Sequence, residues 1–217
     1  MPDYAAQRAN MIESQVRTAD VTDLGVQAAM RECPRERFVP AAKRGLAYMD
    51  GCVEVARGRY LLDPRSLAKM LQLAEIKPTD KVLDVGCTTG YSTAVLSRLA
   101  KNVVGLEQDA DLVRIAIETL AATGYSKAEI AQGPLAGGLP QRAPFDVIFI
   151  NGGIETGPQK LLQQLAEGGR LLCAVREGAA GYARIYVRHD GAIGARDVFD
   201  TYPPVLPGFK QRAGFVF

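Results

Sequence analysis

The sequence predicts an α/β fold built around a largely parallel β-sheet, and three observations lead to this prediction. From residue 81 onward, short apolar runs of strand length alternate with longer stretches of helical pattern, and such alternation produces parallel sheets covered on both faces. A glycine-bounded turn joins the first of these strands to the helix that follows it. The chain has 217 residues, of which 47% are hydrophobic and 23% charged, and these values are ordinary for one globular domain.

The N-terminal region, residues 1–64, lacks the strand–helix alternation and is predicted to add helices to the core. Helices are expected over 5–17 and 22–33, with Thr22 as the candidate N-cap of the second. The apolar positions of that second helix are Leu24, Val26, Ala29 and Met30. A loop bracketed by prolines follows at 34–40. The pair Asp63-Pro64 predicts another helix start, because Asp caps a helix and Pro is tolerated at its first position.

The core region, residues 65–175, carries the strand–helix alternation itself. Its most apolar strand is predicted at 145–150, and Gly168-Gly169 is expected to end the helix that follows. The full set of predicted core elements comprises strands at 81–85, 103–106, 128–131, 145–150 and 170–175, and helices at 91–100, 109–123 and 157–166.

The C-terminal region, residues 176–217, is predicted to form an antiparallel edge of the same sheet. Strands over 182–217 would be joined by turns at Asp190-Gly191 and Pro203-Pro204. The only histidine, His189, falls in the first of these turns, which argues against a hydrolase of the Ser-His-Asp or Cys-His type. The four cysteines are scattered without a Cys-x-x-Cys pair, so neither a metal site nor a disulfide framework is expected.

Charge and hydropathy narrow the class of protein further. The net charge of +2 is too balanced for nucleic-acid binding driven by bulk charge. No apolar run approaches 18 residues, so no membrane-spanning helix is expected. The first residues resemble no secretory signal, and a cytoplasmic location is therefore expected. Nothing in the sequence indicates an oligomeric state.

The strongest local motif is the segment 82–91, VLDVGCTTGY, in which a strand runs into a glycine-bounded turn that opens a helix. Glycines let the backbone approach a ligand closely, and the first N–H groups of a helix attract polar or anionic groups. Glu107 ends the next strand, where an acid can hold the two hydroxyls of a ribose. The motif therefore predicts a nucleoside site, and the competing interpretation is a tight turn with no ligand.

The loop residues favour one class of nucleoside. A dinucleotide fingerprint would place glycine at positions 88 and 91, where this chain has Thr88 and Tyr91, and the chain has no P-loop motif. An acid just before the loop, Asp84, suits a ligand that carries an ammonium group. S-adenosylmethionine combines an ammonium group with a ribose and an adenine, so it is the predicted cofactor.

From about Met11 to Arg176, the sequence resembles the protein-L-isoaspartate O-methyltransferase family. The resemblance implies a Rossmann-like methyltransferase fold, S-adenosylmethionine as cofactor, and the abnormal carboxylate of isoaspartyl residues in aged proteins as methyl acceptor. With the loop motif, it also implies cofactor contacts from Tyr60, Asp84, Gly86, Cys87, Thr88, Thr89, Gly90, Glu107, Gly133 and Pro134. The matching segments are Ala29-Met30, Pro34-Arg35-Glu36, Phe38-Val39-Pro40, Ala47-Tyr48-Met49-Asp50, the loop at 82–91, Ala143-Pro144-Phe145-Asp146, Pro158, Leu161, Gln164-Leu165 and Gly168-Gly169-Arg170-Leu171.

The chain departs from the family pattern at the positions closest to the expected chemistry. The family's segment Gly-Gln-Thr-Ile-Ser-Gln-Pro is here Gly58 to Pro64, which puts Leu62 at the position of the catalytic serine. Thr88 replaces the middle glycine of the loop. Pro134 replaces the acid expected near the adenine, so adenine would be held by apolar and backbone contacts. Asn151-Gly152-Gly153 replaces a Thr-Ala-Ala segment.

These departures leave three hypotheses open. A carboxylate with a pKa near ~4 is ionised at neutral pH and needs no general base to accept a methyl group, so loss of the serine weakens isoaspartate repair more than methyl transfer itself. Arg59 could hold a substrate carboxylate or be an exposed arginine, and Asp63 could act in catalysis or only cap a helix. The chain is thus an isoaspartate methyltransferase, a methyltransferase with another acceptor, or a non-catalytic S-adenosylmethionine-binding module.

Overall fold

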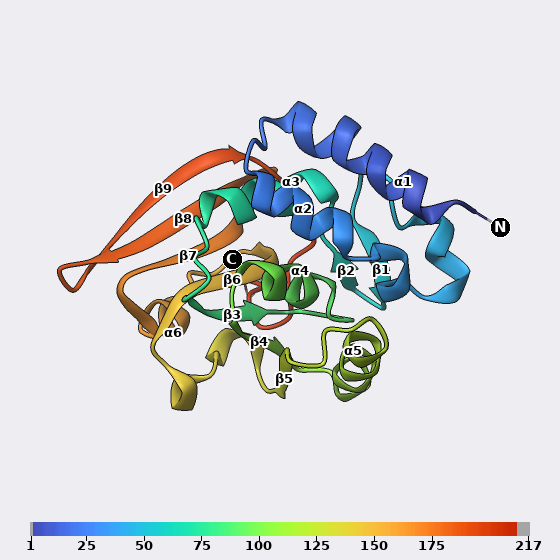
Figure 1. The fold of residues 1–217 in the computed structure, drawn as a ribbon. Helices are drawn as coiled ribbons and strands as arrows, with labels where there is room; N and C mark the ends of the chain where they lie inside the picture. The colour runs from blue at the N-terminus through green and yellow to red at the C-terminus, as the bar shows by residue number, and fades with distance from the viewer. Residues whose placement is uncertain (1, 212–217) are drawn as a thin grey trace, which may run out of the picture.

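A seven-stranded sheet organises the computed structural model, which describes residues 2–211 (Figure 1). The strand order is β5-β4-β3-β6-β7-β8-β9, with parallel pairing from β5 to β7 and antiparallel pairing from β7 to β9. The predicted Rossmann-like α/β class with an antiparallel C-terminal edge is confirmed. The strands are β3 (Lys81–Val85), β4 (Asn102–Glu107), β5 (Glu129–Gln132), β6 (Phe145–Ile154), β7 (Leu165–Glu177), β8 (Ala180–His189) and β9 (Ala192–Asp200).

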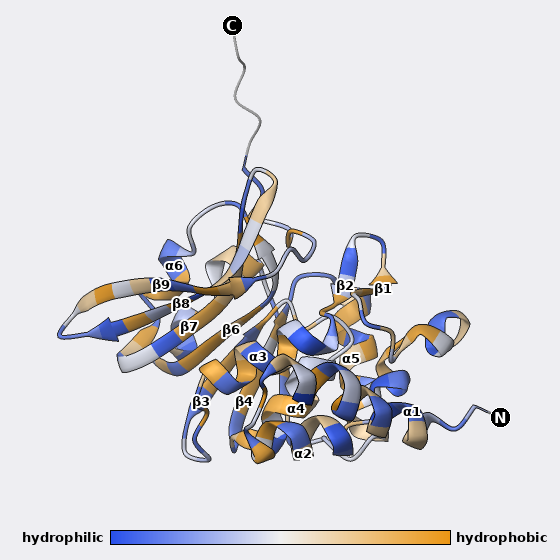
Figure 2. Ribbon diagram, turned by 90° about the horizontal axis from the view of Figure 1, so that it is seen from above, coloured by the Kyte–Doolittle hydropathy of each residue, from blue (hydrophilic) through white to orange (hydrophobic). Residues whose placement is uncertain are grey.

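Helices cover both faces of this sheet, and the central strands are accordingly apolar along both faces (Figure 2). On β6, Val147 and Phe149 belong to one core cluster, whereas Ile148 and Ile150 belong to the other, because successive side chains of a strand point to opposite faces. The first cluster packs under α1 to α4, and the second packs against α6 and the C-terminal segment. The helices are α1 (Tyr4–Met11), α2 (Leu24–Glu32), α3 (Pro64–Leu73), α4 (Tyr91–Leu99), α5 (Ala110–Ala122) and α6 (Gln159–Leu162).

The N-terminal helices differ from the prediction in detail. The helix expected over 5–17 is α-helical only to Met11 and continues as a π-helical turn and a 3₁₀ turn to Ala19. The N-cap of α2 is Asp23, whose carboxylate accepts from Val26 N, and not Thr22, whose amide donates to Gln72 Oε1. Leu24 is 77% exposed, so it lies outside the apolar face expected for this helix.

A small hairpin stands apart from the main sheet and leads into α3. Its strands are β1 (Val53–Ala56) and β2 (Arg59–Leu61), which pair antiparallel around the turn at Arg57-Gly58. Gly58 has φ +68°, a backbone conformation that glycine adopts without strain. At the end of the hairpin, Asp63 Oδ1 accepts a hydrogen bond from Ser66 N at 2.7 Å and caps α3, as the sequence indicated.

The C-terminal part also departs from two predictions. The helix expected over 157–166 ends at Leu162, because Gln164 turns its side-chain amide toward Leu139 N and Gly137 O, and Leu165 already pairs with Phe145 in the sheet. The turn expected at Pro203-Pro204 is wrong.

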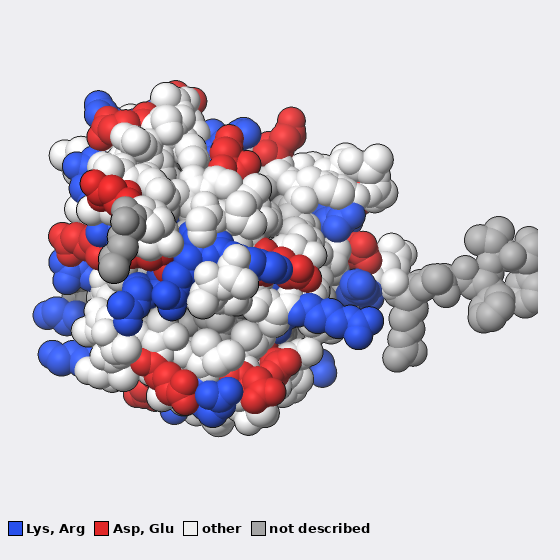
Figure 3. All heavy atoms as spheres, turned by 90° about the vertical axis from the view of Figure 1, so that its right-hand side faces the viewer, with Lys and Arg blue, Asp and Glu red and all other residues white. Residues whose placement is uncertain are grey.

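The segment that follows β9 is extended instead and returns to the carboxyl ends of the parallel strands. Val205 forms a parallel bridge with Gly153 of β6, and Leu206 N donates to Gly153 O at 2.9 Å. The part of the prediction that concerns 212–217 lies outside the described residues. Among residues 2–211, no helix combines the length and apolarity needed to cross a bilayer. On the face drawn in Figure 3, positive and negative side chains are interspersed.

Candidate functional site

The glycine-bounded loop lies between β3 and α4, at the carboxyl end of the parallel strands. Gly86 has φ +78° and Gly90, the N-cap of α4, has φ +95°, so both positions need a residue without a side chain. The loop is held against β4 because Gly86 N and Cys87 N both donate to Leu106 O, at 2.8 and 3.3 Å. This is the strand–turn–helix geometry that the sequence predicted.

Thr88, in the middle of the loop, has φ +52°. A β-branched residue is rarely found in this left-handed region, which costs about 1–3 kcal/mol for residues other than glycine. The hydroxyl of Thr88 donates to Cys87 O at 2.8 Å, and its backbone N–H donates to Glu107 Oε2 at 3.0 Å. The position therefore keeps a glycine-like backbone although the sequence supplies threonine.

Glu107 ends β4 directly beside this loop, and its side chain is fully buried. Its carboxylate accepts three backbone hydrogen bonds, from Thr88 N to Oε2 and from Gln108 N and Asp109 N to Oε1, at 3.0, 2.8 and 3.2 Å. The acid thus stands at the predicted position, and the backbone of the loop orients it.

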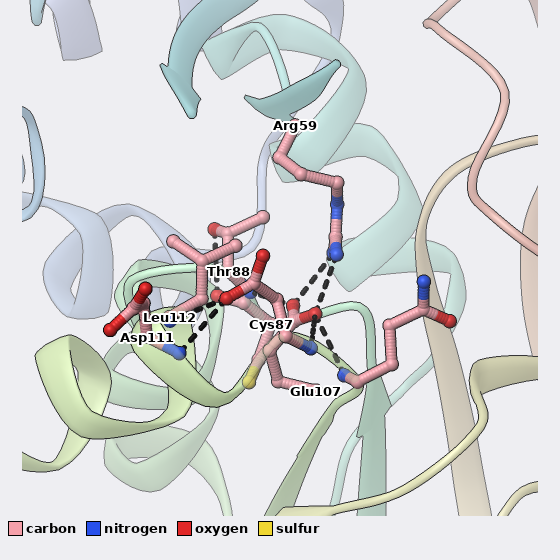
Figure 4. A network of polar contacts seen from close by, with 8 residues as sticks. Arg59, Cys87, Thr88, Glu107, Asp111 and Leu112 are labelled. Atoms are coloured by element: carbon pink, nitrogen blue, oxygen red, sulfur yellow. Dashed lines mark hydrogen bonds and ion pairs between the residues drawn. The ribbon is translucent and has the colours of Figure 1, made fainter. Parts of the chain in front are cut away.

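The guanidinium of Arg59 forms a two-point ion pair with Glu107 (Figure 4). Nη1 lies 2.5 Å from Oε1 and Nη2 lies 2.7 Å from Oε2. Arg59 reaches the loop from β2, and it is only 4% exposed. The sequence interpretation of Arg59 as an exposed arginine is therefore wrong, and its partner in the structure is the acid of the predicted ribose site.

Side chains fill the space in front of the loop. A Cβ placed on Gly86 would lie 2.9 Å from Cδ1 of Leu206 and 3.5 Å from Nη2 of Arg59. The remaining cavity has a volume of about 10 Å³, which is at the lower limit of the roughly 10–15 Å³ that one water molecule needs. It is lined by Tyr60, Leu61, Leu62, Leu67, Thr88, Tyr91, Ser92 and Asn151.

Asp84 lies in the protein interior and is engaged by side chains of the core. Oδ2 accepts from the hydroxyls of Ser92 and Thr93 at 2.8 and 2.6 Å, and Oδ1 accepts from the amide of Asn151. Complete burial raises the pKa of the Asp84 carboxyl to about 6, although these hydrogen bonds oppose the shift. Asn151, noticed in the sequence only as a departure from the family, is thus the partner of Asp84.

The remaining residues of the loop are held by protein contacts. Cys87 is fully buried, with Sγ 3.0 Å from where a Cβ on Gly105 would lie, and burial raises the pKa of its thiol well above the ordinary value. Thr89 Oγ1 donates to Phe38 O at 2.6 Å. Near β5, Gly133 N donates to Glu107 O at 3.0 Å, and Pro134 is exposed and precedes a 3₁₀ turn.

Leu62, which the sequence resemblance places opposite the family's serine, is buried, with 4% of its surface exposed. Its carbonyl oxygen accepts from Nη2 of Arg35 at 2.7 Å, and the Arg35 guanidinium lies 4.7 Å from the ring centre of Tyr91. Leu62 is therefore part of the packing around the site. No pattern in the sequence pointed to Leu206, because its contact with the loop depends on how the C-terminal segment returns to the sheet.

Comparison with known proteins agrees with this architecture. A model of the protein-L-isoaspartate(D-aspartate) O-methyltransferase family matches residues 6–202. The chain is 40% identical over 169 residues to protein-L-isoaspartate O-methyltransferase of Opitutus terrae, covering 78% of this chain and 72% of that protein. It is 39% identical over 184 residues to the protein of the same name from Koribacter versatilis, covering 85% and 82%.

Two solved structures share the fold. One, named protein-L-isoaspartate O-methyltransferase, superposes with a TM-score of 0.81 at 24% identity over 93% of this chain and 66% of its own, so this chain spans slightly under two thirds of its length. The other, a protein-L-isoaspartate O-methyltransferase from Plasmodium falciparum in complex with S-adenosyl-L-homocysteine, gives 0.80 at 21% identity over 95% and 99%. By its sequence and its fold, the chain belongs to the protein-L-isoaspartate(D-aspartate) O-methyltransferase family.

Proposed function

We propose that this protein transfers a methyl group from S-adenosylmethionine to the carboxylate of isoaspartyl residues in proteins or peptides. The observation that carries the proposal is the placement of Glu107 at the carboxyl end of β4, beside the loop that starts at Gly86. This is the part of a doubly wound sheet where nucleosides bind. Membership of the family supplies the class of reaction and acceptor.

The cofactor contacts in this proposal come from the loop and its neighbours. In this proposal Glu107 would accept hydrogen bonds from the ribose hydroxyls, and the backbone of the loop at Gly86, Cys87 and Gly90 would line the site. The donor set fits a nucleoside, because the carboxylate and the glycine loop have the required order and spacing. Arg59 and Leu206 fill the same space in this structure, so a nucleoside can enter only when Arg59 leaves Glu107.

Methyl transfer to a carboxylate requires no general acid or base from the protein. When bound, S-adenosylmethionine supplies a methyl group on a positively charged sulfur. The acceptor carboxylate is ionised at neutral pH because its pKa is near ~4, so the protein's contribution is placement of the two reactants and exclusion of water. Leu62 excludes water but offers no hydrogen bond to the acceptor, which predicts slow turnover.

Methyl transfer from labelled S-adenosylmethionine to an isoaspartyl peptide, compared with its normal aspartyl twin, tests this function. We expect base-labile label on the isoaspartyl peptide alone, as a methyl ester requires. Glu107→Gln should reduce transfer, and the matched control Glu129→Gln, which alters an exposed carboxylate on the adjacent β5, should not.

The relative from Koribacter versatilis serves as the reference protein in the same assay. Label on both peptides would mean that the acceptor is not selected for isoaspartate. Folded protein that labels neither peptide, while the relative labels its acceptor, would contradict the proposed function.

A further inference from the structure

We infer that Arg59 is a built-in competitor for the nucleoside: its guanidinium occupies the carboxylate of Glu107 that the ribose needs, and it thereby sets the affinity of this site for its cofactor. The inference rests on the proposed use of S-adenosylmethionine. The observation behind it is the buried two-point pair between these residues, at 2.5 and 2.7 Å.

The hydrogen-bonding capacity of Glu107 is already used up. An ionised carboxylate offers about four lone-pair positions, and Glu107 accepts from three backbone N–H groups and two N–H groups of Arg59. The backbone donors belong to the loop and to the turn after β4, so they cannot leave without unfolding that part of the site. The two donors of Arg59 are the ones that a pair of ribose hydroxyls can replace.

The geometry of the loop agrees with competition for space as well as for hydrogen bonds. Gly86 lacks a side chain at the point where a ligand approaches the backbone, and Nη2 of Arg59 lies 3.5 Å from where its Cβ would be. Both charged side chains are nearly inaccessible, at 5% and 0% of their side-chain surface. Arg59 and a nucleoside therefore cannot occupy this position together.

Release of Arg59 does not require the fold to open. Arg59 lies on β2 of the small hairpin, next to the exposed turn Arg57-Gly58, so we expect rotation about its side-chain bonds to withdraw the guanidinium. Glu107 would keep its three backbone hydrogen bonds. When Arg59 is paired with Glu107, its Nε is buried without a hydrogen-bond partner. An unpaired buried donor makes this paired arrangement less favourable.

Calorimetric binding of S-adenosyl-L-homocysteine, which cannot donate a methyl group, tests the inference without any activity assay. Arg59→Gln should lower the dissociation constant by about tenfold or more. The apparent constant falls because the fraction of protein in which Glu107 is free to bind the ribose rises from about a tenth to nearly all. Arg59→Lys, which keeps the charge but loses the two-point geometry, should give an intermediate value. Arg57→Gln, a change to an exposed arginine of the same hairpin, should leave the wild-type value unchanged.

The outcomes separate this inference from the proposed function. If wild type and both Arg59 variants bind with the same affinity, competition by Arg59 is refuted and the cofactor assignment stands. If none of the folded variants binds at millimolar ligand, both the cofactor assignment and the competition are overturned. Thermal denaturation with and without ligand checks folding, and if Arg59→Gln does not fold, the comparison of wild type with Arg59→Lys decides the question.

Discussion

Replacing Asp84 by asparagine should make the protein more stable at neutral pH. The carboxylate of Asp84 is fully buried, and burial raises its pKa from 3.8 to about 6 in the folded protein. The amide of asparagine has the same shape, so its oxygen can accept from Asn151 while its NH₂ group donates to the hydroxyls of Ser92 and Thr93, which can also act as acceptors. The substitution removes the buried charge and keeps the network.

The pH dependence follows from the direction of this shift. The pKa of Asp84 is higher in the folded than in the unfolded protein, so the folded protein binds the proton more tightly. The stability that this proton contributes is fully present below pH 3.8. That stability is lost as the pH rises to about 6. The difference between 3.8 and about 6 corresponds to about 3 kcal/mol at neutral pH.

Urea denaturation of wild type and Asp84→Asn, followed by circular dichroism at a series of pH values, measures this effect. The stability advantage of the variant should grow by about 3 kcal/mol from about pH 3 to about pH 7. Other titrating groups are common to both proteins, so their contributions cancel in the difference. An advantage that does not change with pH would mean that the carboxylate of Asp84 does not take up a proton in this range, contrary to this prediction.

Three further substitutions follow from the packing around the loop. Leu62→Ser should lower the free energy of unfolding by about 2–5 kcal/mol, since it truncates a buried side chain; a change under 1 kcal/mol in urea denaturation would contradict the packing described for this residue. Glu107→Gln should destabilise the protein by about 1–3 kcal/mol, because the neutral amide weakens the buried hydrogen bonds with Arg59, and combination with Arg59→Gln should recover part of that loss in a double-mutant cycle. Gly86→Ala should destabilise by about 1–3 kcal/mol because of φ +78° and the 2.9 Å approach of Leu206; thermal denaturation should show partial rescue by Leu206→Ala, and no coupling would argue against this contact.

The sheet and the loop could be predicted because their signals are local. The apolar run at 145–150 has the composition of a strand buried on both faces, and β6 occupies it. Gly86 and Gly90 mark backbone that turns with positive φ, which the structure contains. The end of α6 was not predictable in this way, because the side chain of Gln164 is drawn to a loop that precedes β6 in the chain.

The side-chain pairs of the site could not be predicted, because they depend on contacts between segments that are distant in the sequence. Arg59 and Glu107 are separated by 48 residues, and Asp84 and Asn151 by 67. The sequence shows that each of these polar residues exists, but it does not show which partner the fold provides. Glu107 was therefore predicted as an acceptor for ribose, whereas its ion pair with Arg59 emerged only from the arrangement of the hairpin over the sheet.

The return of the C-terminal segment across the parallel strands determines when the site can be assembled during folding. Leu206 packs against Gly86 and Gly152, its N–H donates to Gly153 O, and Gly153 N donates to Pro204 O. These contacts join one of the first strands of the sheet to residues that are synthesised only after β8 and β9. Contacts between distant segments form late and slowly. A growing chain can thus build the parallel strands early, but the loop remains uncovered until the segment after β9 has been made and has packed against it.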